Sequence, residues 1–137
     1  MLVIRTATGD DLPAVVELWN TDGGPTRHAG QLAEAVVLVQ RDPDALLVAE
    51  LDGVLVGSLV AGWDGWRFHL YRLAVASAYR RRGVATALLD SAIERAGALG
   101  AVAVDAMVHA GNVGAEHFWE RAGFDLSTGD RRWSKVL

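Results

Sequence analysis

The spacing of hydrophobic and polar residues in the first third of the chain is that of one strand followed by two helices. Residues 2–6 are rich in β-branched side chains, which predicts a short strand. Hydrophobic residues then recur at helical intervals from about Asp10 to Asn20, and again from about Arg27 to Gln40. The segment Asp22-Gly23-Gly24-Pro25 predicts the loop between the two helices.

From Ala45 the period becomes that of β-structure. Two apolar runs, 45–51 and 54–63, are joined by Asp52-Gly53, and such a two-residue link is a strong indication of a hairpin. A second Asp-Gly pair leads into a third run, 66–75, so we expect three strands in an antiparallel meander. Gly57 and Gly62 inside the second run predict a bulge or a close backbone approach.

The last part of the chain has the pattern of a helix, a strand and a second helix. A wide apolar stripe predicts a helix from about Gly83 to Leu99, and 101–108 reads as a strand. A strand–helix–strand unit with such a crossover implies that the two strands run parallel. Asn112 is a suitable N-cap for a last helix over about 113–122. Residues 124–126 and 131–136 predict a closing hairpin, in which Trp133 would be a core or interface residue.

The predicted order is therefore βααβββαβαββ, an α/β mixed sheet with helices on its faces. No repeat or linker interrupts it, so we expect a single domain over residues 1–137. The net charge of −4 argues against nucleic-acid or membrane-surface partners. The chain has no cysteine, which excludes disulfides, a thiol nucleophile and thiolate metal sites. No run reaches the ~18 apolar residues of a membrane span and no signal peptide is evident, so we expect a cytoplasmic location.

Three consecutive arginines, Arg80, Arg81 and Arg82, stand where the helix that starts near Gly83 begins. Cations are disfavoured at a helix N-terminus, whose N–H groups and dipole favour anions. The run therefore predicts a phosphate site, although Lys135 is the only lysine and the arginines are equally explained as ordinary solvated cations. Neither Gly-x-x-x-x-Gly-Lys-Ser/Thr nor Gly-x-Gly-x-x-Gly after a strand is present, which makes nucleotide hydrolysis and dinucleotide redox chemistry poor explanations.

The segment Leu73–Leu89 resembles the acetyl-CoA motif of the GNAT superfamily of N-acetyltransferases. Arg80, Gly83 and Ala85 match its Gln/Arg-x-x-Gly-x-Gly/Ala pattern. The segment Asn112–Phe124 resembles the Asn-x-x-Ala-x-x-Phe-Tyr-x-x-x-Gly-Phe ending of the same family, and the order of elements agrees along essentially the whole chain.

This resemblance implies a cofactor site and a reaction. Backbone groups of Leu73 and Val75 would pair with the pantetheine arm of acetyl-CoA between two splayed parallel strands, and Asn112 would contact that arm. The pyrophosphate would lie on the loop and first helical turn that hold Arg80, Arg81, Arg82, Gly83, Val84, Ala85 and Thr86. Acetyl transfer to an amine would be direct, with no metal and no covalent enzyme intermediate.

The resemblance departs from the family at the position where a tyrosine often protonates the CoA thiolate, because this chain has Trp119 there. An indole N–H is not an acid near neutral pH. For the base we single out His69, which strand alternation places on the same face as Tyr71, Leu73 and Val75; Tyr71 is a candidate acid. Both side chains are equally explained as structural, and His109 and His117 are weaker candidates that we expect to be exposed.

Trp19, Trp63 and Trp66 lie at the ends of predicted elements that border the acceptor groove in the family. They predict an aromatic-walled pocket for an amine, with core closure as the competing explanation. We thus expect an acyl-CoA-dependent N-acyltransferase that acetylates a small molecule or a protein amino group, as a monomer or a homodimer. The alternatives are a CoA-binding sensor or interaction module with little or no turnover, and a generic phosphate- or nucleotide-binding protein.

Overall fold

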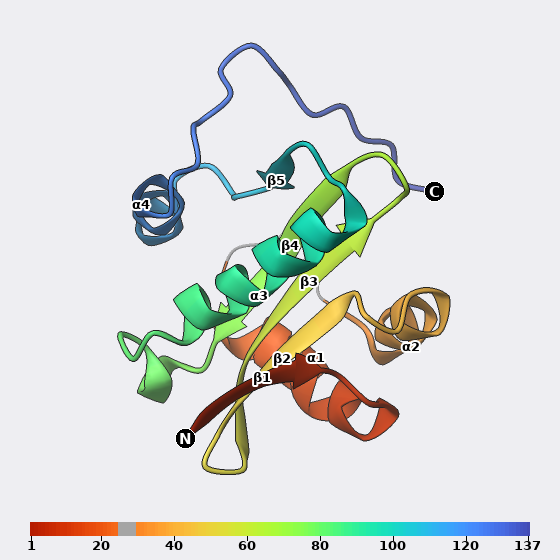
Figure 1. Ribbon diagram of the computed structural model, residues 1–137, viewed down its shortest axis with the longest axis vertical. Coiled ribbons are helices and arrows are strands. Elements are labelled where there is room, and N and C mark those ends of the chain that lie inside the picture. The colour runs from red at the N-terminus through yellow and green to blue at the C-terminus, as the bar shows by residue number, and fades with distance from the viewer. Residues whose placement is uncertain (25–29) are drawn as a thin grey trace.

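The computed structural model describes residues 1–24 and 30–137. Its helices and strands follow the predicted order as far as the last helix (Figure 1): β1 (Leu2–Thr6), α1 (Leu12–Asp22), α2 (Leu32–Arg41), β2 (Leu46–Leu51), β3 (Val54–Trp63), β4 (Phe68–Val75), α3 (Val84–Leu99), β5 (Val104–Ala106) and α4 (Val113–Arg121). Short 3-10 turns, η1 (Gly9–Asp11) and η2 (Ser77–Tyr79), precede α1 and follow β4.

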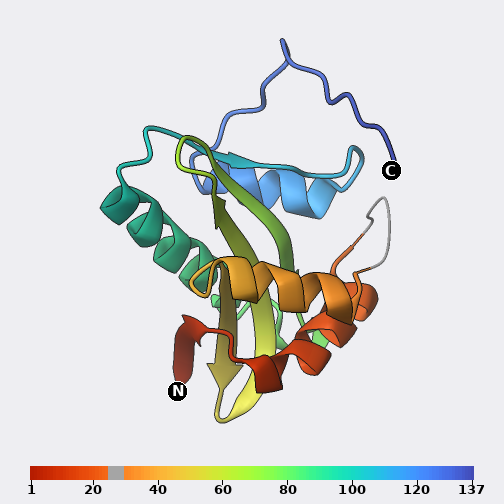
Figure 2. The same cartoon turned by 90° about the vertical axis from the view of Figure 1, so that its right-hand side faces the viewer.

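The five strands form one mixed sheet in chain order. The strands from β1 to β4 are antiparallel to their neighbours, and β5 pairs with β4 in parallel. Helices cover both faces: α1 and α2 pack on one, and α3 and α4 on the other (Figure 2). The predicted α/β mixed sheet with helices on its faces is confirmed.

The β2–β3 hairpin has the predicted turn. Asp52 and Gly53 both have positive φ, of 50° and 82°, as a type I′ turn requires. Gly57 in β3 marks a close approach, because a Cβ atom there would lie 2.8 Å from Val84 Cγ1 of α3. The absence of a side chain at Gly57 thus lets the first turn of α3 lie directly on the sheet.

The sheet opens between its two parallel strands. The β4–β5 ladder covers only Phe68, His69 and Leu70 of β4, although β4 continues to Val75. The edge of β4 over residues 71–75 therefore has no β5 partner, which confirms the predicted splay of these strands.

The closing hairpin is not formed. Residues 125–137 contain no helix or strand and arch away from the sheet (Figures 1 and 2). Trp133, for which a core or interface position was predicted, is 91% exposed. The prediction was wrong because β propensity alone does not create a strand: a strand needs a partner edge, and this segment does not pair with β5.

The second helix begins later than predicted. Gln31 has extended backbone angles, φ −125° and ψ 147°, so α2 starts at Leu32 rather than near Arg27. The predicted start itself lies outside the described residues.

Candidate active site

The loop before α3 has the geometry of an anion site. Arg81 and Gly83 have positive φ, of 62° and 80°, and α3 begins immediately afterwards at Val84. The first N–H groups of a helix have no intrahelical partner, and within the described residues no side chain caps this end of α3. A Cβ atom at Gly83 would meet nothing within 4 Å, so the space above the loop is open to a phosphate.

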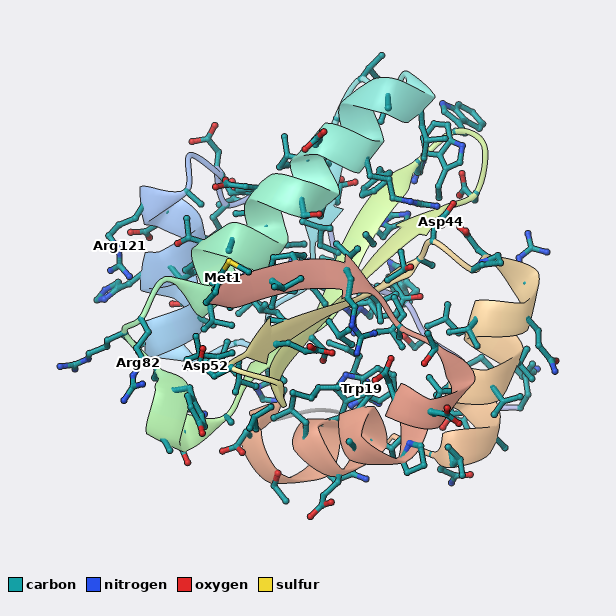
Figure 3. All side chains as sticks on the ribbon, turned by 60° about the horizontal axis from the view of Figure 1, so that its bottom comes forward. Met1, Trp19, Asp44, Asp52, Arg82 and Arg121 are labelled. Atoms are coloured by element: carbon teal, nitrogen blue, oxygen red, sulfur yellow. The ribbon has the colours of Figure 1, made fainter. Side chains whose placement is uncertain are left out.

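Arg80 and Arg82 point in different directions and make different contacts. The Arg80 guanidinium donates to the carbonyls of Val75 and Asp22, both at 3.4 Å, and thereby ties the loop to the ends of β4 and α1. Arg82 stacks 5.3 Å from the centre of the Tyr79 ring and extends outward at the edge of the molecule (Figure 3). Arg80 is therefore engaged with the protein, and the backbone N–H groups offer the more direct anion contacts.

A β-bulge in β4 changes the predicted arrangement of the site. Ser58 and Val60 of β3 pair with Ala74 and Tyr71, so two β4 residues, Arg72 and Leu73, oppose one residue of β3. Arg72 has a positive φ of 54°. The extra residue reverses the alternation of side chains beyond it.

The predicted common face of four β4 side chains is consequently wrong. Tyr71 and His69 pair with Val60 and Gly62 and lie on the face covered by α1 and α2. Leu73 and Val75 pack in the cluster on the opposite face, beneath α3. Strand alternation predicts one face for all four only in a regular strand, and the bulge separates them into two pairs.

A cavity of about 190 Å³ lies on the α1–α2 face, beside this bulge. Its described lining comes from α1, from the segment before α2 and α2 itself, and from β3 and β4: Trp19, Gly30, Glu34, Ala35, Leu38, Val60, Tyr71 and Arg72. The cavity thus reaches β4 just beyond Leu70, where the pairing of this strand with β5 ends.

Trp19 lies between α1 and the sheet (Figure 3) and lines the cavity. Its Nε1–H donates a 2.9 Å hydrogen bond to Oγ of Ser58, which is completely buried in β3. Gly30 lies against the ring, since a Cβ atom there would be 2.8 Å from Trp19 Cε3. The Asn20 amide exchanges two 3.0 Å hydrogen bonds with the backbone of Gly30, which holds the start of α2 against the end of α1.

Tyr71 and His69 occupy different parts of this face. Tyr71 lines the cavity and is 42% exposed, and burial of the rest of the side chain raises the pKa of its phenol. His69 pairs with Asp105 in the short β4–β5 ladder. It stands about 20 Å from Val75 along the strand, at ~3.3 Å per residue.

Asn112 has the predicted capping role. Its Oδ1 accepts a 3.3 Å hydrogen bond from the Ala115 N–H in the first turn of α4. Its Nδ2 lies at the chain segment after α1, where a Cβ atom at Gly24 would be 3.3 Å away. The segment after α1 and the start of α4, which are distant in sequence, therefore lie side by side.

Trp119, at the position of the family's tyrosine, is a core residue. It is 8% exposed and makes edge contacts with the rings of Phe118 and Phe124, at centroid distances of 5.1 and 4.9 Å. Of the other tryptophans considered for the acceptor pocket, Trp63 packs on Phe68 and Trp66 is 77% exposed, and neither lines the cavity. Of these three tryptophans, Trp19 is thus the one that lines the cavity. His109 and His117 are exposed, as expected.

Glu34, Arg72 and Gly30 line the cavity but were not singled out from the sequence. Glu34 and Gly30 belong to a helical pattern with no distinguishing motif. Arg72 enters the cavity only because of the bulge, which depends on the pairing of β3 with β4. Within residues 1–24 and 30–137, no group of three metal-ligating side chains is present, and no helix has the length and apolarity to cross a bilayer.

The sequence is similar to a recognised family. Residues 12–124 match the model of the acetyltransferase (GNAT) family. An acetyltransferase from Sodalis glossinidius is 31% identical over 123 residues, covering 90% of this chain and 87% of the relative. An acetyltransferase from Yersinia pestis is 34% identical over 122 residues, covering 89% of this chain and 86% of the relative.

Solved structures share the fold. Ard1 from Thermoplasma volcanium superimposes with a TM-score of 0.83 at 23% identity, over 93% of this chain and 84% of that one. The yncA putative acetyltransferase from Salmonella typhimurium, solved with its cofactor acetyl-CoA, gives 0.77 at 20% identity, over 93% and 81%. Ribosomal-protein-alanine N-acetyltransferase from Brucella melitensis gives 0.74 at 29% identity, over 90% and 84%.

Proposed function

Because this chain belongs to the GNAT acetyltransferase family, we propose that it transfers an acetyl group from acetyl-CoA to an amine held in the cavity beside Tyr71. The observation that carries the proposal is the bulge in β4. At the bulge, the part of β4 that β5 does not cover adjoins the cavity, and the same strand leads on to the open N-terminus of α3.

The described backbone suits acetyl-CoA. The free edge of Leu73 and Val75 can hydrogen-bond the pantetheine arm as an added strand would. The loop and first turn from Arg81 to Thr86 present N–H groups for the pyrophosphate, and Asn112 lies across the opening. The solved Salmonella relative with acetyl-CoA supports this choice of acyl donor.

The reaction needs two proton transfers. The ammonium of the acceptor must lose a proton before its nitrogen attacks the thioester carbon, and the departing CoA thiolate must gain one. We propose Tyr71 as the acid, because its phenol lines the cavity and its raised pKa keeps it protonated at neutral pH. His69, two residues away on the same face, is the proposed base.

Two measurements test the function. Acetyl-CoA should raise the melting temperature, since a ligand that binds only the folded state stabilises it, whereas ATP with magnesium should have little effect. CoA release should then appear with at least some members of a panel of amines. The opposite ranking of the two ligands would refute the proposal.

A matched pair of glycine variants tests the phosphate site. Gly83 and Gly53 both have φ near 80° and open space at Cβ, but only Gly83 stands at α3. Gly83→Trp should weaken acetyl-CoA binding at least 100-fold by filling that space, while Gly53→Trp, with similar backbone strain, should leave the affinity within about threefold. Isothermal titration calorimetry on both folded variants would show this, and equal affinities would rule out the site.

The burial of Trp119 favours one alternative function, a CoA-binding module with little turnover, because no hydroxyl stands where the family's tyrosine would. Acetyl-CoA binding at micromolar concentration without CoA release from any amine would favour this alternative.

A further inference from the structure

The cavity beside Tyr71 has one cationic and one anionic side chain in its described lining, Arg72 and Glu34. They come from different elements, β4 and α2, and the aromatic rings of Trp19 and Tyr71 line the same space. The cavity therefore offers both charges to a ligand in a site that also has two aromatic walls.

Three features of the described residues help to hold Arg72 in place. The bulge fixes its backbone in the left-handed region, its guanidinium stacks 5.4 Å from the centre of the Trp19 ring, and one of its Nη atoms would be 3.7 Å from a Cβ atom at Gly30. Trp19 is in turn held by its hydrogen bond to Ser58. A guanidinium positioned in this way can bind a carboxylate with two parallel hydrogen bonds, and most of its ordering occurs before the ligand arrives.

From these features we infer that the acceptor is a zwitterion of amino-acid size, whose carboxylate binds Arg72 and whose ammonium is attracted by Glu34. The inference rests on the proposed function and names the substrate class for the same site. A purely cationic amine would be repelled by Arg72, and a purely anionic ligand would be repelled by Glu34. A zwitterion instead presents a group of opposite charge to each of the two side chains.

The volume of the cavity agrees with a small acceptor. Pockets for drug-sized ligands measure roughly 300–1,000 Å³, whereas this one measures about 190 Å³. Substrates of a few to about a dozen heavy atoms are the appropriate size.

The chemical balance of the step is simple. The ammonium gives one proton to the base, its nitrogen forms a C–N bond with the thioester carbon, and the C–S bond breaks. The sulfur leaves with the bonding electrons and takes up the second proton of the amine, through Tyr71. The products are an N-acetylated amino acid, CoA and one proton released to solvent.

Matched acceptors test the inference by CoA release. Leucine would be compared with 3-methylbutylamine, which lacks the carboxylate, and with leucine methyl ester, in which the carboxylate is masked. The ester amine is less basic than that of leucine, so more of it is neutral at pH 7.5 and it should react faster in the absence of recognition. We expect kcat/KM for leucine to exceed that for either analogue at least tenfold, with phenylalanine and 2-phenylethylamine showing the same order.

Single-residue variants then test whether Arg72 and Glu34 bind the acceptor. Arg72→Gln should lower kcat/KM for leucine 10- to 100-fold, as expected for loss of charge-assisted hydrogen bonds, and change that for the ester less than threefold. Arg67→Gln is the matched control, because Arg67 also stacks on a tryptophan, 5.6 Å from the Trp66 ring, but lies outside the cavity. Glu34→Gln, at an exposed position of α2, should raise KM for leucine and for the ester alike.

Unchanged affinity for acetyl-CoA in each variant would show that the protein remains folded and loaded. Equal rates with leucine and its analogues, or equal losses in Arg72→Gln and Arg67→Gln, would overturn the zwitterion inference while leaving acetyl transfer intact. A failure of the wild-type protein to bind acetyl-CoA, or to release CoA with any acceptor, would overturn both proposals.

Discussion

Tyr71 shows how one residue depends on its neighbours across the sheet. It is the last β4 residue before the bulge, and its ring covers Gly62, where a Cβ atom would lie 3.5 Å from Tyr71 Cε1. The partial burial that results raises the pKa of the phenol above its usual value near 10. The hydroxyl therefore remains a proton donor throughout the neutral and mildly alkaline range.

Tyr71→Phe should lower kcat about 10- to 100-fold with little change in KM for acetyl-CoA, because it removes the proposed acid and keeps the ring. On the alkaline side, the activity of the wild-type protein should fall as the pH rises through the raised pKa of Tyr71, and the variant should lack this alkaline limb. His69→Ala should instead flatten the acidic limb if His69 is the base. Full pH–rate profiles of the three proteins would test whether Tyr71 and His69 take part in proton transfer. Profiles that superimpose would show that neither residue does.

At the scale of elements, the position of α3 on β3 determines where the loop that we propose for phosphate binding lies. The contact is close because Gly57 has no side chain: besides Val84 Cγ1, a Cβ atom there would lie 3.1 Å from Leu88 Cδ1. Both of these residues are buried in the first half of α3. A displacement of this helix would move the N–H groups that we propose for pyrophosphate binding.

Gly57→Ala should therefore lower the free energy of unfolding by about 1–3 kcal/mol through overpacking and also weaken acetyl-CoA binding. Gly97→Ala is the control within α3, since a Cβ atom there meets nothing within 4 Å. It should stabilise the protein by up to about 1 kcal/mol, because alanine favours helix, and leave acetyl-CoA affinity unchanged. Urea unfolding and calorimetry would measure both effects, and parallel changes in the two variants would contradict this account of the contact.

At the scale of the whole molecule, an ion-pair network joins the first two strands to the turn before α1. Arg5 in β1 donates to both carboxylate oxygens of Asp11, at 2.7 and 2.9 Å, and to Glu50 in β2. Asp11 also accepts from the Thr8 N–H at 2.7 Å. The hydrogen bonds from Arg5, followed by those from Thr8, hold the pKa of Asp11 well below its usual range.

A carboxylate with a depressed folded-state pKa stabilises the protein above its unfolded pKa of about 4, and this contribution is lost as the pH falls toward the folded value. Asp11→Asn should therefore cost about 1–2 kcal/mol at pH 7, after solvent screening of the charge-assisted bonds, and the cost should shrink below pH 4. Asp10→Asn, at the exposed neighbouring carboxylate, is the control and should cost less than about 0.5 kcal/mol. Thermal unfolding between pH 2 and 7 would compare them, and a cost independent of pH would contradict the assignment.

Much of the fold could be predicted from the sequence because it depends on local patterns of residues. The type I′ turn at Asp52-Gly53, the cap at Asn112 and the apolar stripe of α3 each follow from neighbouring residues. The loop geometry before α3 was predictable for the same reason, since Gly83 and the start of α3 adjoin in sequence, and phosphate binding there is our proposal.

The sequence by itself thus determined the order of elements as far as α4 and the family, and it pointed to the loop before α3 that we propose as the anion site. Only the tertiary structure decided on which face of the sheet each β4 side chain lies, where the cavity forms, and that residues 125–137 form no strand. The bulge at Arg72 arises from pairing with β3, which separates Tyr71 from Val75 and turns Arg72 toward Trp19. Residues 125–137 form no strand despite their composition, because a strand exists only where another strand receives its hydrogen bonds. Local interactions depend on adjacent residues and can be predicted from them, whereas strand pairing and packing join residues that are distant in sequence.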